Sequence, residues 1–304
     1  MKFLKQDKFE FSDDDFPRGI KCEIQSGPVS IKMLRGQMGK EWMVKRDIYC
    51  FKVTIENEHP NTLNEALDVV SRLPLYYMVG LEIVSGENEN GLALYKDLDG
   101  AGGHGGRDYC NVIVTELGLI IHELGHAMEQ EVRITTDENL LEKWKNATDV
   151  DEWNVSPYGN QNAWEDMAEY CIVYSVAYQK NSLDELQILS PTRYAIWTEC
   201  ICLLNDTLRT PRCAQYLGET DTATQNNVLR KLGCLKETNK SPLSDHGSGS
   251  TAGTAQVVVP TEYEPDKDRS NDKKKKKKKK NPEIWFLLLL LVLIVLIIKP
   301  RRGE

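Results

Sequence analysis

Three residues of one short segment have the types and spacing of a metal site. The run His122-Glu123-Leu124-Gly125-His126 has the pattern H-E-x-x-H and lies in an apolar-rich part of the chain. On a helix the two histidines share one face, where both imidazoles can bind one zinc ion while Glu123 acts as a general base on a bound water. The alternative is a hydrogen-bonded pair of histidines on a core helix. The pattern predicts a zinc site with hydrolytic chemistry.

A second segment offers the carboxylate that such a site still needs. Catalytic zinc sites use three protein ligands and leave a fourth position for water. Glu165 and Glu169 are one turn apart in a helical pattern about 40 residues downstream, so they share a face. We expect Glu165 to be the ligand and Glu169 to accept the second N–H of a metal-bound histidine, although the two could exchange roles. Their alternative role is a solvated acidic helix edge.

The residues around these glutamates resemble a known family. Residues 158–169 are similar to the second active-site motif of the anthrax lethal factor-like metallopeptidases, in which a tyrosine precedes the glutamate ligand by seven residues and an Ala-Glu pair follows it. The resemblance implies a gluzincin-type zincin domain in which Glu165 is the third zinc ligand and Tyr158 is a phenol near the zinc. It covers about residues 74–180 and none of the other domains of the toxin. Without it, Tyr158 is an ordinary turn tyrosine.

Together these residues predict a zinc-dependent endopeptidase. Zinc lowers the pKa of its bound water from about 15.7 toward 7, and Glu123 takes the water proton and passes it to the leaving amine. Tyr158 would donate a hydrogen bond to the oxyanion. One alternative is a catalytically silent zincin-like domain that acts as a membrane-anchored protein-binding module, and another is a metal-free helical interaction domain.

The elements that position these residues predict an α+β fold. The site helix is expected over 115–131, and Gly125, a poor helix former beside both histidines, predicts the close approach of a neighbouring group. Strands come first and helices later along the chain, and an exposed strand before the site helix would pair with an extended peptide. The other expected elements are strands at 49–56, 81–84 and 91–96, a glycine-rich loop at 100–106, and helices that begin at Thr62 with a capping box, at Ser190 and at Asn226.

The composition divides the chain into a catalytic domain and a tail. Residues 284–298 are an unbroken apolar run that follows eight consecutive lysines, and we expect this run to be a transmembrane anchor. The expected parts are a loosely ordered N-terminus (1–20), a zincin-like domain with a small N-terminal sheet and a helical C-terminal part (21–237), a disordered tether with the lysine run (238–283), the anchor (284–298) and a short basic tail (299–304).

Charge and cysteines bear on partners and location. Residues 1–270 contain 27 Lys and Arg against 43 Asp and Glu, which excludes nucleic acid as a partner and favours basic peptide substrates. The lysines before the anchor and the lack of a signal-peptide pattern predict a tail-anchored protein with a cytosolic active site. We therefore expect the eight cysteines to be reduced thiols, although their even number and four glycosylation sequons would also fit a luminal domain.

Overall fold

The fold is α+β, with a mixed six-stranded sheet followed by a helical part. The computed structural model describes residues 11–207 and 222–234. The strands are β1 (Glu23–Lys32), β2 (Met38–Arg46), β3 (Tyr49–Glu56), β4 (Leu92–Leu94), β5 (Gly103–Gly106) and β6 (Tyr109–Val112). The helices are α1 (Leu63–Arg72), α2 (Met78–Ile83), α3 (Leu117–Thr135), α4 (Leu140–Asp151), α5 (Ala163–Gln179), α6 (Leu183–Leu189), α7 (Pro191–Thr207) and α9 (Thr222–Lys231), with short 3-10 turns at Asp13–Asp15, Leu75–Tyr77 and Gly159–Gln161.

The sheet places its last strand beside the site helix. The strand order is β1-β2-β3-β4-β6-β5, in which β4 runs parallel to β3 and β6 while the other pairs are antiparallel. Among the described strands, β5 therefore lies at one edge of the sheet and pairs with β6, with Gly103 to Gly106 opposite Val112 to Tyr109. Because β6 leads directly into α3, the connection keeps this edge close to the N-terminal half of the helix.

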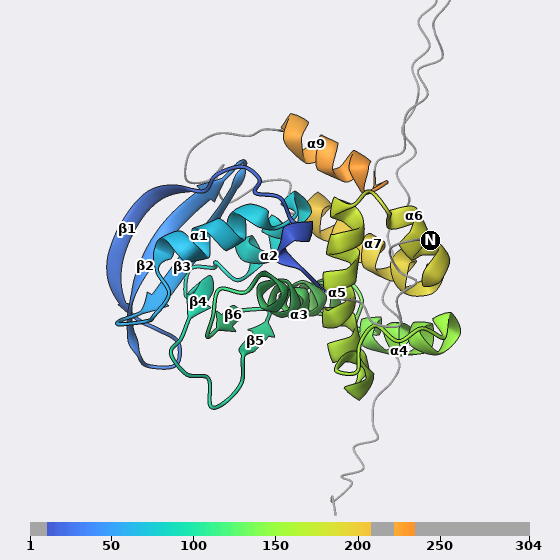
Figure 1. The fold of residues 1–304 in the computed structure, drawn as a ribbon, viewed down its shortest axis with the longest axis horizontal. Helices are drawn as coiled ribbons and strands as arrows, with labels where there is room; N and C mark the ends of the chain where they lie inside the picture. The colour runs from blue at the N-terminus through green and yellow to red at the C-terminus, as the bar shows by residue number, and fades with distance from the viewer. Residues whose placement is uncertain (1–10, 208–221, 235–304) are drawn as a thin grey trace, which may run out of the picture. The chain divides into compact units, whose positions relative to one another are not determined.

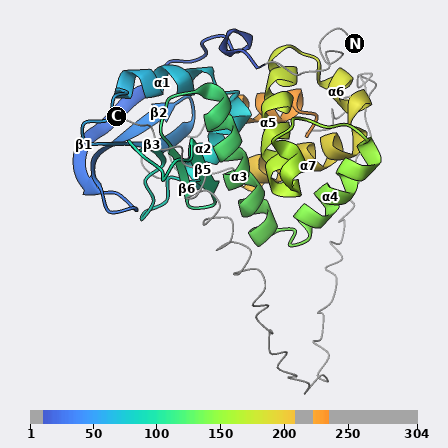
Figure 2. The same ribbon diagram turned by 60° about the horizontal axis from the view of Figure 1, so that its bottom comes forward.

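Helix α3 runs through the middle of the molecule. In Figure 1 the strands lie on one side of α3, and α4, α5, α6 and α7 lie on the other. Figure 2, turned by 60°, keeps the same separation. Leu117, Ile120 and Leu124 of α3 are fully buried in the main core, which also includes residues of the sheet and of α5 and α7. Burial on both sides makes α3 the element that joins the sheet to the helical part.

Several expected elements are confirmed, and each has a local cause. The strand expected over 49–56 is β3, whose side chains are mostly buried. The capping box at the start of α1 forms as expected, since Thr62 Oγ1 accepts from the Glu65 amide and Glu65 Oε2 accepts from the Thr62 amide. The site helix is α3, and the helix expected from Ser190 is α7.

Two expectations about local structure are wrong. Residues 81–84 are not a strand, because Leu81 to Ile83 complete helix α2 and every residue of α2 is buried. A short run that is apolar on all sides does not reveal its own periodicity, so a buried strand and a buried helix look alike in the sequence. The glycine-rich segment at 100–106 is not wholly a loop, since Gly103 to Gly106 form the edge strand β5.

The cysteines are only partly the reduced thiols expected from the sequence. Cys202 of α7 and Cys234 after α9 form a disulfide, and Cys50 is also disulfide-bonded, so the expectation is wrong for these three. Cys22, Cys110, Cys171 and Cys200 are free and buried. The cytosolic location remains a prediction from sequence.

The parts expected in the tail lie outside the described residues. The tether (238–283), the anchor (284–298) and the basic tail (299–304) all follow the last described residue, Cys234. Among the helices that the structure describes, none combines the length and apolar composition needed to cross a membrane. The anchor therefore remains a prediction from sequence.

We predict that the Cys202–Cys234 disulfide stabilises the domain by fastening α9 to α7. The two cysteines are 32 residues apart, and a cross-link of that span contributes about 2–4 kcal/mol by restricting the unfolded chain. Replacing both by serine should lower the free energy of unfolding, measured in urea, by that amount. A non-reducing digest of the native protein should contain the linked peptides, and recovery of both cysteines as free alkylated thiols would contradict the assignment.

Candidate metal centre

Helix α3 carries two histidines and a glutamate into the interior. His122, Glu123 and His126 are 7%, 5% and 4% exposed. The next residue but one after Glu123 is Gly125, where an added Cβ would lie 2.8 Å from the Cys171 sulfur of α5, too close for real atoms. The glycine thus permits the close approach between α3 and α5 that its position beside the histidines predicts.

Helix α5 carries the two glutamates that face α3. Its N-cap is Asn162, whose Oδ1 accepts from the amides of Trp164 and Glu165, both at 3.0 Å. This cap fixes the first turn of α5, and therefore the backbone from which the Glu165 carboxylate extends. Glu169 follows one turn later on the same face, as expected from the spacing.

The side chains of the two helices converge on one point. His122 Nε2 lies 3.2 Å from His126 Nε2 and 3.2 Å from Glu165 Oε2, and Oε2 lies 3.5 Å from His126 Nε2. Within the described residues, His122, His126 and Glu165 form a group whose ligand atoms all lie within 4.8 Å of one another. Glu169 does not point to the same place, because its Oε1 accepts from His122 Nδ1 at 2.9 Å.

The three ligand atoms are better suited to binding a cation than to hydrogen-bonding with one another. Glu165 Oε2 is buried and has no hydrogen-bond partner among the described residues, although it faces two imidazole nitrogens. A buried carboxylate oxygen without a partner is costly, and one cation between the three atoms would satisfy it. Two imidazoles and a carboxylate are ligands that zinc and other transition metals accept.

The electrostatics separate Glu123 from the other two carboxylates. Burial raises the pKa of Glu123 to about 7, against a smaller opposing effect of His122. The facing His126 ring lowers the pKa of Glu165, and the hydrogen bonds from His122 and Ser156 outweigh burial and lower that of Glu169. Glu123 is thus the carboxylate whose proton is exchanged most readily near neutral pH.

The imidazoles are also shifted in opposite directions. Burial lowers the pKa of His122, but the hydrogen bond to Glu169 and the nearby carboxylates outweigh it, so that the net shift is upward. Burial lowers the pKa of His126, and its partners do not compensate. His126 is therefore the more readily neutral ring, which is the state that binds a metal.

A cleft of about 440 Å³ opens onto this group. His122, Glu123 and Glu169 line it together with Tyr158, whose ring lies 5.7 Å from that of His122 and is 49% exposed. Burial and the charges of Glu165 and Glu123 raise the pKa of Tyr158, so the phenol keeps its proton and can donate it in a hydrogen bond. Tyr158 thus lies at the mouth of the site, where a bound molecule would meet it.

The edge strand β5 forms the opposite wall of the cleft. An added Cβ at Gly103 would overlap the Glu123 carboxylate, and one at Gly105 would overlap the Glu123 backbone carbonyl. Only glycines let the strand lie this close to α3. The glycine-rich sequence is thus a packing requirement of the site, while His104 between them is exposed.

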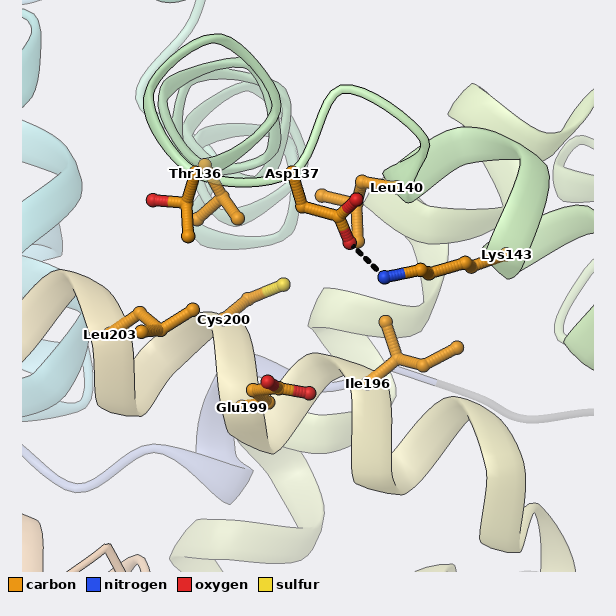
Figure 3. A pocket seen from close by; sticks show the side chains of 9 residues that line it. Thr136, Asp137, Leu140, Lys143, Ile196, Glu199, Cys200 and Leu203 are labelled. Atoms are coloured by element: carbon orange, nitrogen blue, oxygen red, sulfur yellow. Dashed lines mark hydrogen bonds and ion pairs between the residues drawn. The ribbon is translucent and has the colours of Figure 1, made fainter. Parts of the chain in front are cut away.

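A second cavity, of about 260 Å³, lies between the C-terminal end of α3, α4 and α7. Figure 3 shows the ion pair of Lys143 with Asp137, 2.6 Å apart, across from the Cys200 sulfur. Burial raises the pKa of the Cys200 thiol well above its ordinary value, so it is not a reactive thiolate. No histidine lines this cavity, and the metal-ligand group found among the described residues lies beside the other cleft, at Glu123.

Comparisons with protein-family models, with curated proteins and with solved structures gave no match to this chain. The resemblance of residues 158–169 to the lethal factor-like metallopeptidases therefore remains an expectation from sequence, and the structure shows a buried group of His122, His126 and Glu165 that is compatible with an HExxH zincin-like site.

The structure brings the expected side chains close together and adds residues that hold them, while the catalytic roles remain predictions from sequence. Of the six expected site residues, four line one cleft, namely His122, Glu123, Tyr158 and Glu169, and the other two, His126 and Glu165, lie against His122. The structure adds the cap residue Asn162. The sequence offers a signal for it, because an asparagine directly before an apolar helical pattern is a typical N-cap. The structure also adds Trp164, whose ring contacts His126 at 4.2 Å, and no sequence signal points to that contact.

We predict that ionisation of Glu123 destabilises the metal-free protein. Its pKa of about 7 exceeds the ordinary 4.5, so the folded state holds a proton that the unfolded state has lost, and stability falls as pH rises through this interval. Glu123→Gln cannot ionise. Its free energy of unfolding relative to wild type should rise by about 3 kcal/mol between pH 4.5 and pH 8 in urea titrations with chelator. A difference that does not change with pH would contradict the prediction.

Proposed function

We propose that this protein is a zinc-dependent endopeptidase of the gluzincin type. The observation that carries the proposal is the convergence of His122, His126 and Glu165 at the base of a cleft that His122 and Glu123 line. Three protein ligands of this composition with an open side are characteristic of catalytic zinc sites, whereas structural sites are closed by a fourth ligand. When bound there, zinc supplies a Lewis acid and a water of lowered pKa.

Glu123 is the general base in this proposal. Its carboxylate lines the cleft next to His122, and its pKa of about 7 lies near the pH at which the protein would work. A base with such a pKa can take a proton from water and return it to a leaving amine without a large energetic cost in either direction. Tyr158, protonated and half-exposed beside His122, is placed to donate a hydrogen bond to the developing oxyanion.

The proposed substrate is a peptide in extended conformation. β5 is an edge strand of the sheet and lies against Glu123, and we expect its outer edge to offer backbone donors and acceptors beside the proposed site. An extended peptide pairs with such an edge through its own backbone, and the cleft then receives its side chains. Leu119 and Ile172, both partly exposed, give the cleft apolar surface. In the full chain, the segment at 284–298 would tether this activity to a membrane.

We expect stoichiometric zinc and cleavage that depends on Glu123. Glu123→Gln should retain one zinc per chain but lose at least about 10²-fold in turnover, because it removes the base and no ligand. Glu165→Gln should lose zinc itself. The measurement is elemental analysis together with mass spectrometry of cleavage sites in a proteome-derived peptide library, on protein without residues 238–304.

The same measurements distinguish the peptidase from the silent binding domain and from a metal-free domain. Zinc bound at full stoichiometry with no peptide cleaved by wild type would contradict peptidase activity and leave the silent binding domain. Absence of zinc in wild type would contradict the metal site altogether. Equal turnover by wild type and Glu123→Gln would contradict the role of Glu123.

We predict that Gly102 controls the size of the side chain that the cleft accepts. An added Cβ there would lie 3.8 Å from Leu119 Cδ1, an ordinary contact, and Gly102 lines the cleft, so we expect a larger side chain at this position to reduce the space in the cleft. Gly102→Leu should lower kcat/KM at least about tenfold for peptides with a large apolar residue next to the scissile bond, and much less for those with alanine. Gly102→Ala is the matched control and should stay near wild type. Equal losses for both peptide classes would contradict the prediction.

A further inference from the structure

The two histidines of the proposed metal site are held in different ways. His122 has a hydrogen bond from Nδ1 to Glu169 Oε1 at 2.9 Å, which fixes the orientation of its ring. His126 Nδ1 is buried and has no hydrogen-bond partner among the described residues. Histidine ligands are ordinarily oriented by a hydrogen bond on the nitrogen that does not bind the metal. Another contact must therefore set the orientation of His126.

The contact that takes this place is the indole ring of Trp164. Its centroid lies 4.2 Å from that of His126, with the two planes inclined at 47°. Trp164 directly precedes Glu165, and the Asn162 cap holds the amides of both residues. The tryptophan is thus fixed at its backbone by the same turn that positions the third ligand.

The indole N–H of Trp164 lies near the carboxylate of Glu129, which is buried and paired with the partly exposed Arg133. Glu129 lies one turn beyond His126 on α3, is 1% exposed, and accepts from Arg133 Nε at 2.7 Å. Burial raises the pKa of Glu129, while Arg133 and, to a smaller extent, the indole N–H of Trp164 lower it. Trp164 Nε1 and Glu129 Oε2 are both buried without a regular hydrogen bond among the described residues, so this carboxylate is the acceptor available to the indole.

We propose that Trp164 is a positioning residue that orients His126 for metal binding, and that the Glu129–Arg133 ion pair keeps Trp164 in place. The inference rests on the proposed metal site and adds to it a cause for the geometry of one ligand. Ring packing restricts the tilt of the imidazole, and the anchored indole prevents the two rings from sliding apart. Neither Trp164 nor Glu129 contributes an atom to the metal-ligand group.

The test measures metal binding without any peptide. Trp164→Leu keeps an apolar side chain but removes the ring, whereas Trp164→Phe keeps a ring and removes the N–H. Trp153→Leu is the matched control, because Trp153 is also partly buried but packs on the Arg193 guanidinium, 5.2 Å from its ring. Zinc affinity is measured by competition with a chromophoric chelator, and the geometry of the site by the visible spectrum of the Co²⁺-loaded protein.

We expect Trp164→Leu, which loses both ring and anchor, to bind zinc at least about tenfold more weakly and to change the Co²⁺ spectrum. Trp164→Phe, which keeps a ring but loses the anchored N–H, should bind about threefold more weakly, and Trp153→Leu should be unchanged. Wild-type affinity and spectrum in Trp164→Leu would overturn the inference, and so would equal losses in Trp164→Leu and Trp164→Phe. If Trp164→Leu does not fold, Glu129→Ala takes its place. It should weaken zinc binding by about threefold or more, and unchanged binding would overturn the inference.

These outcomes are distinct from a failure of the proposed function. If the wild-type protein binds no zinc, both the proposed metal site and the proposed role of Trp164 are wrong. If wild type binds zinc and Trp164→Leu binds it equally well, only the role of Trp164 falls, and the proposed peptidase site is unaffected.

Discussion

The close packing of α3 against α5 is the constraint on which the site depends. Gly125 leaves no side chain between the helices, so Cys171 of α5 lies directly against the α3 backbone. At that separation, two pairs of residues spaced four apart, His122 and His126 on one helix and Glu165 and Glu169 on the other, face each other. A larger residue at Gly125 would move the carboxylates away from the imidazoles.

This packing also explains how three carboxylates share a small volume. Two of them face imidazoles, which favour their ionised form, and the third, Glu123, faces the edge strand and the cleft. The environment therefore assigns different protonation behaviour to chemically identical groups. The glycines of β5 contribute to this difference, because they bring backbone rather than polar side chains against Glu123.

Much of the site could be predicted from the sequence because its spacing is local. Residues four apart on a helix share a face, so His122 and His126, and likewise Glu165 and Glu169, could be paired without a structure. The choice between the two glutamates depends on how α3 and α5 cross, which no local pattern specifies. The same holds for Trp164, whose position next to Glu165 suggests nothing about its contact with His126. The strand β5 could not be predicted, because its glycines are typical of loops. Glycines occur in a strand where another backbone approaches closely, as α3 does here.

The central claim is that two imidazoles and one carboxylate hold a metal beside Glu123, and X-ray absorption at the zinc edge tests it most directly. The purified wild-type protein should contain one zinc per chain, with nitrogen and oxygen neighbours at about 2.0–2.2 Å and the outer-shell scattering of two imidazoles. A sulfur neighbour at about 2.3 Å would assign the metal to the cysteines instead. That result, or the absence of bound zinc, would contradict the account.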